Sequence, residues 1–485
     1  MVESAAIREM SHISLFVKRI LSAKGARMQQ QDITPKLKEG LSNRHIMMIS
    51  LGGVIGAGLF VGSSAAIAKA GPAVVISYLI TSVMVFLVMR MLGEMAVMQP
   101  DTGSFATYAR KAIGQWAGFT IGWLYWWFWV LVIPIEAIAG AHILHAWLPI
   151  LPSWLYAIMF VVGLSFANLF SIKNFGEFEF WFSLIKVVAI VGFIIIGSMA
   201  IFGLWPLAPE VSGVSHLFSH GGFMPNGFGS VLGAVLITAF SFFGVEILSI
   251  AAAESEKPQE KIRKATNLVL YRTILFFVVS IFLAVCLVDW RAPQLQSLGT
   301  FQYVLTTLNV PATKLIIDSV VFVAVASCMN AALYTSSRML FSLGARHDAP
   351  RMVTRVNHKG VPRVAVIAST FVGILCCLAN YLFPGQVFNL LLSTTGAIAL
   401  LVYLVIAISQ LRLRQRLEAQ GQSPAFKMWL FPWLTWFVIA IIVMVLGYML
   451  FSPLYRHETL MSFGVALFVV LCGLYVTRNR ISERL

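Results

Sequence analysis

Charged residues are scarce in this sequence. Asp, Glu, Lys and Arg make up only 11% of its 485 residues, whereas an ordinary soluble domain carries about 25%. Hydrophobic residues make up 59%, and the mean hydropathy is +0.84. This composition excludes a soluble globular protein and predicts an all-α membrane protein that crosses the bilayer many times.

Cysteine and nucleotide-binding motifs are also scarce or missing. The five cysteines all lie in apolar stretches, without metal-ligand spacing or a secreted disulfide pattern. No Gly-x-x-x-x-Gly-Lys-Ser/Thr motif, Cys/His metal set or pair of carboxylates on the soluble side occurs. We therefore expect no cofactor and no metal, and neither an enzyme nor an ATP-driven pump.

Acidic residues are fewer than basic ones. The sequence has 20 Asp and Glu and 35 Lys and Arg, which gives a formal net charge of +15. With twelve spans and a cytoplasmic N-terminus, 30 of the 35 basic residues fall in cytoplasmic segments or at the cytoplasmic ends of spans, as the positive-inside rule requires. The exceptions are Lys69, Arg291, Lys314, Arg456 and, within a span, Lys186. The charge therefore predicts that both termini are cytoplasmic, and it does not indicate a nucleic-acid partner.

Twelve apolar stretches can be read along the chain. They cover about 46–68, 73–93, 116–147, 153–172, 180–204, 228–252, 268–289, 313–337, 363–383, 386–410, 429–451 and 461–477. A basic tail over 1–44 precedes a membrane domain over 45–477, and a short tail over 478–485 follows it. We expect a short helix within Pro100–Gly114 and an amphipathic surface helix over Ser336–Val353. Met28 is an alternative start to Met1.

Two of these stretches contain a predicted break in mid-membrane. The first carries Gly52, Gly53, Gly56 and Gly58 within Leu51–Phe60, and each Gly weakens a helix by about 1 kcal/mol. Close helix packing is the alternative explanation for such glycines. The second break is predicted in the sixth stretch, where Ala239–Glu246 interrupts an apolar helix.

The two breaks lie five spans apart, which predicts two inverted five-helix repeats over about 46–204 and 228–410, followed by two extra helices over 429–477. Paired broken helices indicate the binding site of a secondary transporter. The N–H groups at one break suit a carboxylate, and the carbonyl groups at the other suit an ammonium. We therefore expect a small zwitterionic substrate.

Charged residues inside a membrane helix cost about 2.5–3.5 kcal/mol each, so three residues are candidates for proton coupling. Lys186 is either a buried ammonium or a side chain that reaches back to the interface. Glu136 is either a proton carrier or ammonium partner, or a protonated carboxyl bonded to a neighbouring helix. Glu246, at the second break, serves either proton coupling or gating, or makes a helix-end or helix–helix hydrogen bond.

Polar and aromatic side chains near the breaks are further candidates. Ser327, Cys328 and Asn330 interrupt the eighth stretch and either line the cavity or bond between helices. Phe242 and Phe243 are candidates for a lid over the ligand.

Several motifs together resemble the amino acid transporter branch of the amino acid–polyamine–organocation superfamily. They are Gly52–Phe60, Pro100–Tyr108, Ile121–Pro134, Asn174–Trp181, Gly221–Gly229, Ala251–Ser255 and Gly396–Ala407. Within that branch, they are most similar to the motifs of permeases for 4-aminobutyrate (GABA). The resemblance runs from about residue 41 to 475.

The resemblance implies a LeuT-like fold in the bacterial inner membrane and uptake coupled to protons. It places the substrate carboxylate at Gly56–Gly58, within the segment Val54, Ile55, Gly56, Ala57 and Gly58. It places the ammonium at the Phe240–Gly244 backbone, where Phe240, Ser241, Phe243 and Gly244 are the candidate contacts. Lys186 would stand where sodium-coupled relatives hold an ion.

One departure concerns substrate choice. Relatives that carry α-amino acids often read Gly-Gly-Ser-Ile-Gly-Thr-Gly at the first break, whereas Val54 and Ala57 replace the two hydroxyl residues here. This change suits a ligand without an α-ammonium, such as GABA. A permease for proline or an aromatic amino acid, a membrane amino acid sensor and a channel are the alternatives, and no sequence signal specifies an oligomeric state.

Overall fold

The computed structural model describes residue 48 and residues 55–99, 104–169, 172–246, 258–357, 360–383, 386–453 and 455–482. Within these ranges all regular structure is helical. The α-helices are α3 (Ala57–Phe60), α4 (Gly62–Ala70), α5 (Val74–Met98), α6 (Ser104–Ala112), α7 (Gln115–Trp147), α8 (Ser153–Asn168), α9 (Ile172–Ile201), α10 (Gly227–Phe242), α12 (Pro258–Thr273), α13 (Ser280–Leu287), α14 (Pro293–Leu298), α15 (Thr300–Thr307), α16 (Thr313–Ala345), α17 (Arg363–Leu382), α18 (Gln386–Ala419), α19 (Trp433–Phe451) and α20 (Arg456–Ser482).

Among the described residues, nine helical stretches are long and apolar enough to cross a membrane, and α8 and α10 are shorter apolar helices. Every apolar stretch predicted from the sequence overlaps at least one of these elements. The all-helical membrane architecture is therefore confirmed. The short helix expected after the second stretch is α6.

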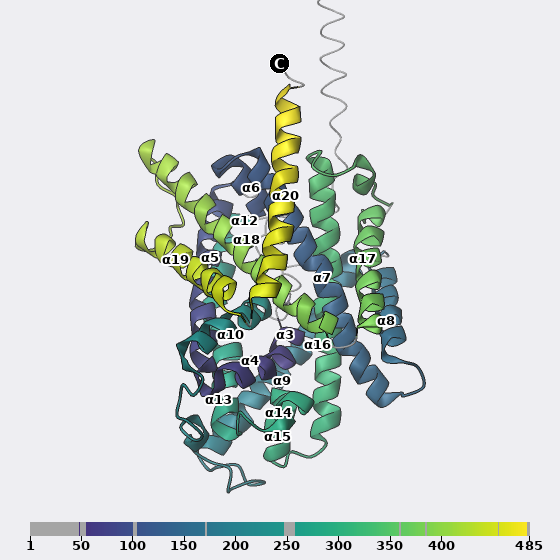
Figure 1. The fold of residues 1–485 in the computed structure, drawn as a ribbon, viewed down its shortest axis with the longest axis vertical. Helices are drawn as coiled ribbons and strands as arrows, with labels where there is room; N and C mark the ends of the chain where they lie inside the picture. The colour runs from purple at the N-terminus through teal and green to yellow at the C-terminus, as the bar shows by residue number, and fades with distance from the viewer. Residues whose placement is uncertain are drawn as a thin grey trace, which may run out of the picture. The chain divides into compact units, whose positions relative to one another are not determined.

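Helices α7 and α16 lie side by side through the bundle, with α8 and α17 beyond them (Figure 1). Their close approach depends on small residues. A Cβ added to Gly122 of α7 would lie 2.7 Å from the Leu343 side chain of α16, and one added to Gly140 would lie 3.2 Å from Val325. Since no hydrophobic effect drives helices together in lipid, such tight contacts stabilise the bundle.

The amphipathic surface helix predicted over Ser336–Val353 is wrong. Helix α16 continues without a break to Ala345, and Met339, Leu340 and Leu343 are buried inside the bundle. The pattern misled because Arg338, one of the three arginines that suggested a surface, is buried: its guanidinium lies 3.4 Å from the Tyr334 ring centre.

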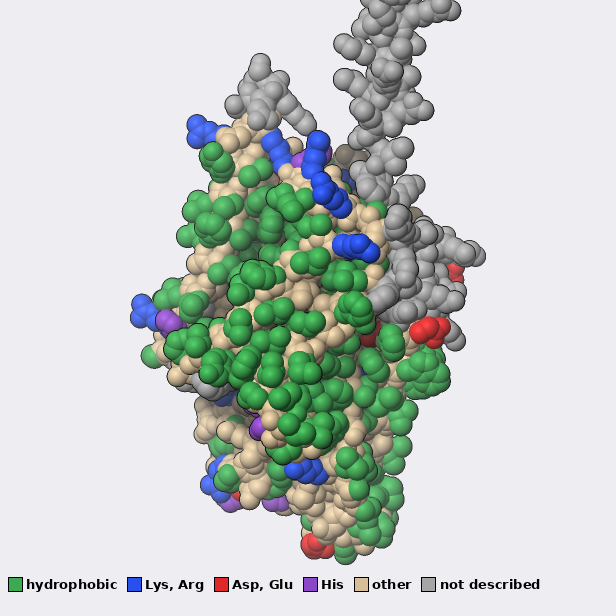
Figure 2. Space-filling model, turned by 90° about the vertical axis from the view of Figure 1, so that its right-hand side faces the viewer, with side chains coloured by type: hydrophobic (Ala, Val, Ile, Leu, Met, Phe, Trp, Pro, Cys, Tyr) green, Lys and Arg blue, Asp and Glu red, His purple; other side chains and the backbone are tan. Residues whose placement is uncertain are grey.

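The outer surface of the bundle is largely apolar. Figure 2 shows hydrophobic side chains spread over the middle of one face, with Lys and Arg side chains at its margins. Large side chains such as Val188, Phe371 and Phe468 are 62%, 60% and 68% exposed. Exposed apolar surface of this extent is that of helices that face lipid.

Candidate functional site

A helix starts within the predicted first break, and a carboxylate lies against that start. Gly56 has an extended backbone, and α3 begins at Ala57. The N–H of Ala57 donates to Glu136 of α7, at 3.3 Å from Oε1 and 3.1 Å from Oε2. Glu136 is 1% exposed. The free N–H groups at a helix start attract an anion. Here the Glu136 carboxylate is that anion.

The glycines of this break also allow close packing. A Cβ on Gly56 would lie 2.8 Å from Glu136 Oε1 and 2.9 Å from Cys328 Sγ, and one on Gly58 would lie 2.8 Å from the Ser241 Cα. Both explanations offered by the sequence therefore apply to the same residues. Gly52, Gly53 and Val54 lie outside the described residues.

The second break follows α10 at the expected place. Phe243 leaves the helix with ψ 142°, and Gly244 has φ +112°, a conformation that favours glycine. The Gly244 N–H donates to Glu246 at 2.9 and 3.1 Å, and the Tyr125 hydroxyl donates to the same carboxylate at 3.1 Å. Glu246 thus has the helix-end hydrogen bond that was one of its two predicted roles.

A small cavity lies between the two breaks. Its volume is about 10 Å³, enough for a single water molecule. It is lined by Gly56, Gly58, Phe128, Trp129, Val132, Glu136, Phe240, Ser241, Phe243 and Cys328. Residues predicted separately at the first break, the sixth stretch and the eighth stretch therefore meet at one place.

Only one of the two candidate lid phenylalanines reaches this cavity. The Phe243 ring lies 4.0 Å from the Phe128 ring centre and 5.1 Å from that of Tyr403. Phe242 points elsewhere and packs against Tyr78 and Phe277. The prediction for Phe242 is wrong because neighbouring positions of a helix end face different sides.

Lys186 lies in a buried polar cluster next to this cavity. Its Nζ donates to Ser327 Oγ at 2.7 Å and lies 3.9 Å from Glu179 Oε1. The Ser327 hydroxyl donates to Glu179 at 2.6 Å. Lys186 and Glu179 have no exposed surface, so the lysine does not reach back to the membrane interface.

Glu179 is a functional candidate that the sequence analysis missed. It lies inside the quoted motif Asn174–Trp181, seven residues before Lys186 on the same helix. Seven residues are close to two helical turns, so the two side chains share a face. That spacing of a carboxylate and an ammonium is the signal that could have found it.

The three polar candidates of α16 have different surroundings. Cys328 lines the cavity, whereas Ser327 lies in the Lys186 cluster. Asn330 accepts a hydrogen bond from Asn168 of α8 at 2.6 Å, the interhelical role offered as the alternative. Ile55, Ala57, Gly244 and Glu246 lie beside the breaks without lining the cavity.

The two ends of the bundle differ. A cavity of about 500 Å³ lies where α7 ends and α16 begins, and His142, Lys314 and Asp318 are among its lining residues. Helices α14 and α15 border it and lie at the lower end of Figure 1. Phe60, the last residue of α3, also lines this cavity. Only the short helix α3 therefore separates the cavity from the first break.

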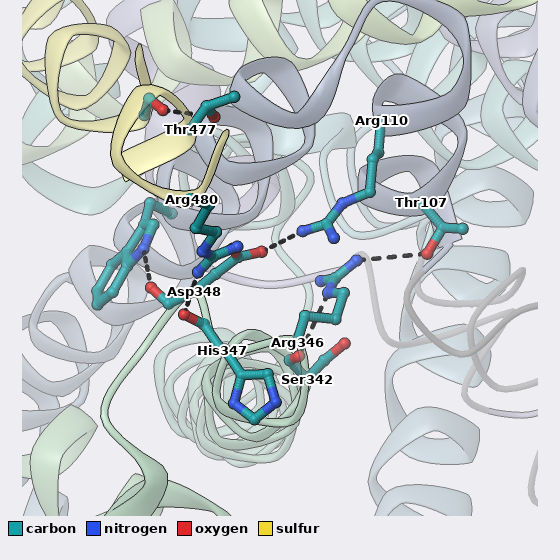
Figure 3. Close-up of polar contacts among 10 residues, drawn as sticks. Thr107, Arg110, Ser342, Arg346, His347, Asp348, Thr477 and Arg480 are labelled. Atoms are coloured by element: carbon teal, nitrogen blue, oxygen red, sulfur yellow. Dashed lines mark hydrogen bonds and ion pairs between the residues drawn. The ribbon is translucent and has the colours of Figure 1, made fainter. Parts of the chain in front are cut away.

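At the opposite end of α16, polar contacts connect four helices (Figure 3). Arg110 of α6 and Arg480 of α20 both donate to the Asp348 carboxylate. Trp123 of α7 donates to the Asp348 carbonyl at 3.1 Å, and Arg346 donates to Thr107 of α6 at 3.3 Å. The Asp348 side chain is 1% exposed. We call this group of contacts the ionic latch.

A helical membrane bundle in which the start of one helix and the end of another meet in mid-bundle at a buried cavity, with charged side chains beside them, has the architecture of a secondary transporter. Residues 45–480 match the amino acid permease family. The chain belongs to that family, whose members are transporters rather than enzymes.

Named relatives cover nearly the whole chain. It is 56% identical to a protein of Pseudomonas aeruginosa named "Probable GABA permease", over 92% of this chain and 94% of the relative. Proteins named "Gamma-aminobutyric acid permease" from Escherichia coli and Bacillus subtilis are 54% and 48% identical, each over 92% of this chain and 95% of the relative.

A solved structure shares the fold. A mutant form of a manganese transporter from Eremococcus coleocola superposes with a TM-score of 0.58 at 13% identity, over 90% of this chain and 94% of that chain. At this identity, the likeness concerns the fold alone.

Proposed function

We propose that this protein imports GABA, or a related zwitterionic amino acid, together with a proton by alternating access. The observation that carries the proposal is the meeting of two helix breaks at one cavity beside Glu136. The names of relatives at 48–56% identity support the substrate. The buried titratable side chains beside the breaks support proton coupling.

The proposed architecture has twelve transmembrane helices in the bacterial inner membrane, with both termini in the cytoplasm. Two inverted repeats over about 46–204 and 228–410 precede two extra helices over 429–477, within a membrane domain over 45–477. The match to the family over residues 45–480 supports these bounds. The tails over 1–44 and 478–485 would lie in the cytoplasm.

For substrate binding, we assign the carboxylate to the backbone of Gly56–Gly58 and the ammonium to the carbonyl end of α10 near Phe240–Gly244. A cavity of about 10 Å³ is too small for an amino acid, so binding requires the two breaks to move apart. The Glu136 carboxylate bonded to Ala57 would then give up its place to the carboxylate of the substrate.

For coupling, Glu136, Lys186 and Glu246 remain the candidates, and Glu179 joins them as the partner of Lys186. Protonation of Glu136 would weaken its bond to the helix start and favour the entry of a substrate carboxylate there. Such an exchange would link a proton to each substrate, because the substrate carboxylate would replace the negative charge that Glu136 loses when it is protonated.

The experiment that tests the proposal is uptake of labelled GABA into proteoliposomes with acid outside. Accumulation above equilibrium that an uncoupler abolishes is the expected result. Absence of GABA accumulation in vesicles that do accumulate another amino acid would overturn the GABA assignment. A flux that only equilibrates, without accumulation, would overturn proton symport and favour a channel.

Competition defines the substrate class. Unlabelled GABA should suppress uptake, whereas proline and aromatic amino acids at the same concentration should suppress it much less. Stronger suppression by an α-amino acid would identify the alternative permease. Binding of an amino acid without any transmembrane flux would instead favour the sensor.

A further inference from the structure

A second large cavity lies away from the helix breaks. Its volume is about 510 Å³, and its walls come from α5, α12 and the connection between α18 and α19. The lining residues are Phe86, Arg90, Arg263, Asn267, Tyr271, Ala425, Phe426, Lys427 and Trp429. Three of them are cationic and four are aromatic, so we call it the basic cavity.

Arg90 is held rigidly within this cavity. Its Nε donates to the Lys427 carbonyl at 3.0 Å, and its Nη1 donates to Asn267 at 3.2 Å. Its guanidinium lies 4.5 Å from the Phe426 ring centre and 4.0 Å from that of Trp429. An arginine fixed between aromatic rings holds its remaining N–H groups in one plane, where they can donate two parallel hydrogen bonds to a phosphate or carboxylate.

The positive charge of the basic cavity is not balanced within the described part of the chain. No carboxylate there lies within ion-pair distance of Arg90, Arg263 or Lys427. Glu94 is one turn from Arg90, but its carboxylate accepts hydrogen bonds from Gln410, Arg414 and the Met428 N–H.

The basic cavity lies at the same end of the bundle as the ionic latch. Arg416, near the end of α18, donates to the carbonyls of Lys111 and Ala112 in α6, and α6 supplies Arg110 to the latch. This is the end that carries most of the Lys and Arg, where anionic lipids attract basic segments.

Exposed aromatic rings mark the mouth of the basic cavity as a membrane interface. Tyr271 is 73% exposed and Trp429 is 51% exposed, and Trp433 at the start of α19 is 77% exposed. Trp and Tyr gather at the level of the lipid headgroups because one side of each ring is apolar and the other carries a polar atom.

We propose that the basic cavity binds the headgroup phosphate of an anionic phospholipid, with Arg90 and Arg263 at the phosphate and Lys427 at its outer edge. Trp429 and Tyr271 lie at headgroup depth. The acyl chains follow the exposed apolar face of α12 and of the π-helical segment Ile274–Val279 after it, where Leu268 and Leu275 are 39% and 45% exposed. Basic pockets between transmembrane helices on the cytoplasmic side suit such lipids.

Native mass spectrometry of the full-length protein in detergent tests this proposal. Phosphatidylglycerol is titrated, and the dissociation constant of the first bound lipid is read directly. Arg263→Gln and Lys427→Gln should each weaken that binding about fivefold, the equivalent of about 1 kcal/mol per removed charge. Phosphatidylcholine with the same acyl chains should bind markedly less tightly than phosphatidylglycerol.

Lys264→Gln is the matched control, because Lys264 follows Arg263 but pairs with Glu260 outside the cavity. It should leave lipid binding unchanged.

Unaltered phosphatidylglycerol binding by the doubly substituted Arg263→Gln, Lys427→Gln protein would overturn the proposal, as would equal binding of phosphatidylcholine. Displacement of the lipid by millimolar inorganic phosphate would show a site for a free anion instead. The assay measures no transport, so its outcome is independent of the proposed substrate.

Discussion

At the scale of single residues, the buried charged groups define what the central cavity can do. Glu136 holds the start of α3, Glu246 holds the end of α10, and Lys186 is bound to Ser327 and Glu179. Each is fully or almost fully buried, and an ion in such a place is stable only with partners. Any change of protonation must therefore move these partners.

Glu136→Gln tests the role of the first of these groups. The amide oxygen can still accept from the Ala57 N–H, so the fold should persist, but the side chain can no longer release a proton. We expect pH-driven accumulation of GABA to fall to the equilibrium ratio while exchange of labelled for unlabelled GABA continues. Accumulation equal to that of the unmodified protein in proteoliposomes would exclude Glu136 as the proton carrier.

Lys186→Ala tests the second group. Accumulation should collapse while exchange partly survives, and unchanged proton-driven accumulation would refute a coupling role. Removal of one partner of a buried pair costs about 3–5 kcal/mol, so the unfolding temperature should fall as well.

A double change separates stability from coupling. Lys186→Met combined with Glu179→Gln removes both charges and should recover much of the lost unfolding temperature, because a neutral pair leaves no buried ion. If coupling needs the ammonium, accumulation stays absent in this variant. Recovery of both stability and accumulation would assign Lys186 a purely structural role.

At the scale of elements, the contact between α3 and α10 decides the shape of the cavity. Gly58 lets the α3 backbone lie against Ser241 and Phe240 of α10. The same small residues allow the helix to break and the two broken helices to meet. A single methyl group at this contact is therefore a probe of the site.

Gly58→Ala should place a Cβ 2.8 Å from the Ser241 Cα, where backbone rather than a flexible side chain must shift. We expect a loss of about 1–3 kcal/mol of stability from this overpacking and a marked loss of GABA uptake. Gly192→Ala in α9 is the control, because no atom lies within 4 Å of its added Cβ. It should be neutral or stabilising by about 1 kcal/mol, and equal effects of the two changes on uptake would contradict the assigned contact.

At the scale of the whole bundle, the surroundings of the two ends of α16 differ. The ionic latch joins α6, α7, α16 and α20 at Asp348, whereas a cavity of about 500 Å³ lies at the far end of α16. This asymmetry is expected of one conformation in an alternating-access cycle. Opening towards the latch requires the Asp348 contacts to break.

Asp348→Asn should weaken the latch, since a hydrogen bond to a charged group contributes about 1.5–3 kcal/mol. We expect the latch end to open more often and the labelling of Cys328 by a polar thiol reagent in inside-out vesicles to rise about tenfold, which corresponds to about 1.4 kcal/mol. Peptide mass spectrometry identifies the labelled cysteine. Glu260→Gln, which removes an exposed pair with Lys264, should leave the rate unchanged, and an equal rate in both variants would show that the latch does not control access.

Much of the architecture could be predicted from the sequence because its signals are local. Apolar stretches about 20 residues long must be helical in lipid, where every backbone polar group needs an internal partner. The breaks were also indicated by local signals, namely four close glycines in Leu51–Phe60 and the interruption at Ala239–Glu246. The rarity of charge made Glu136, Lys186 and Glu246 stand out as candidates.

The sequence by itself determined the class of fold, the position of the α10 break and the short list of buried charges, since these depend on hydropathy and on helix propensity along one segment. Only the tertiary structure decided that Glu136 meets Ala57, 79 residues away, that Glu179 pairs with Lys186, and that Phe243 rather than Phe242 faces the cavity. It also decided that α16 runs on to Ala345. These facts depend on the rotation of each helix about its axis and on its position along that axis relative to its neighbours. Packing between segments that are distant in the sequence determines both.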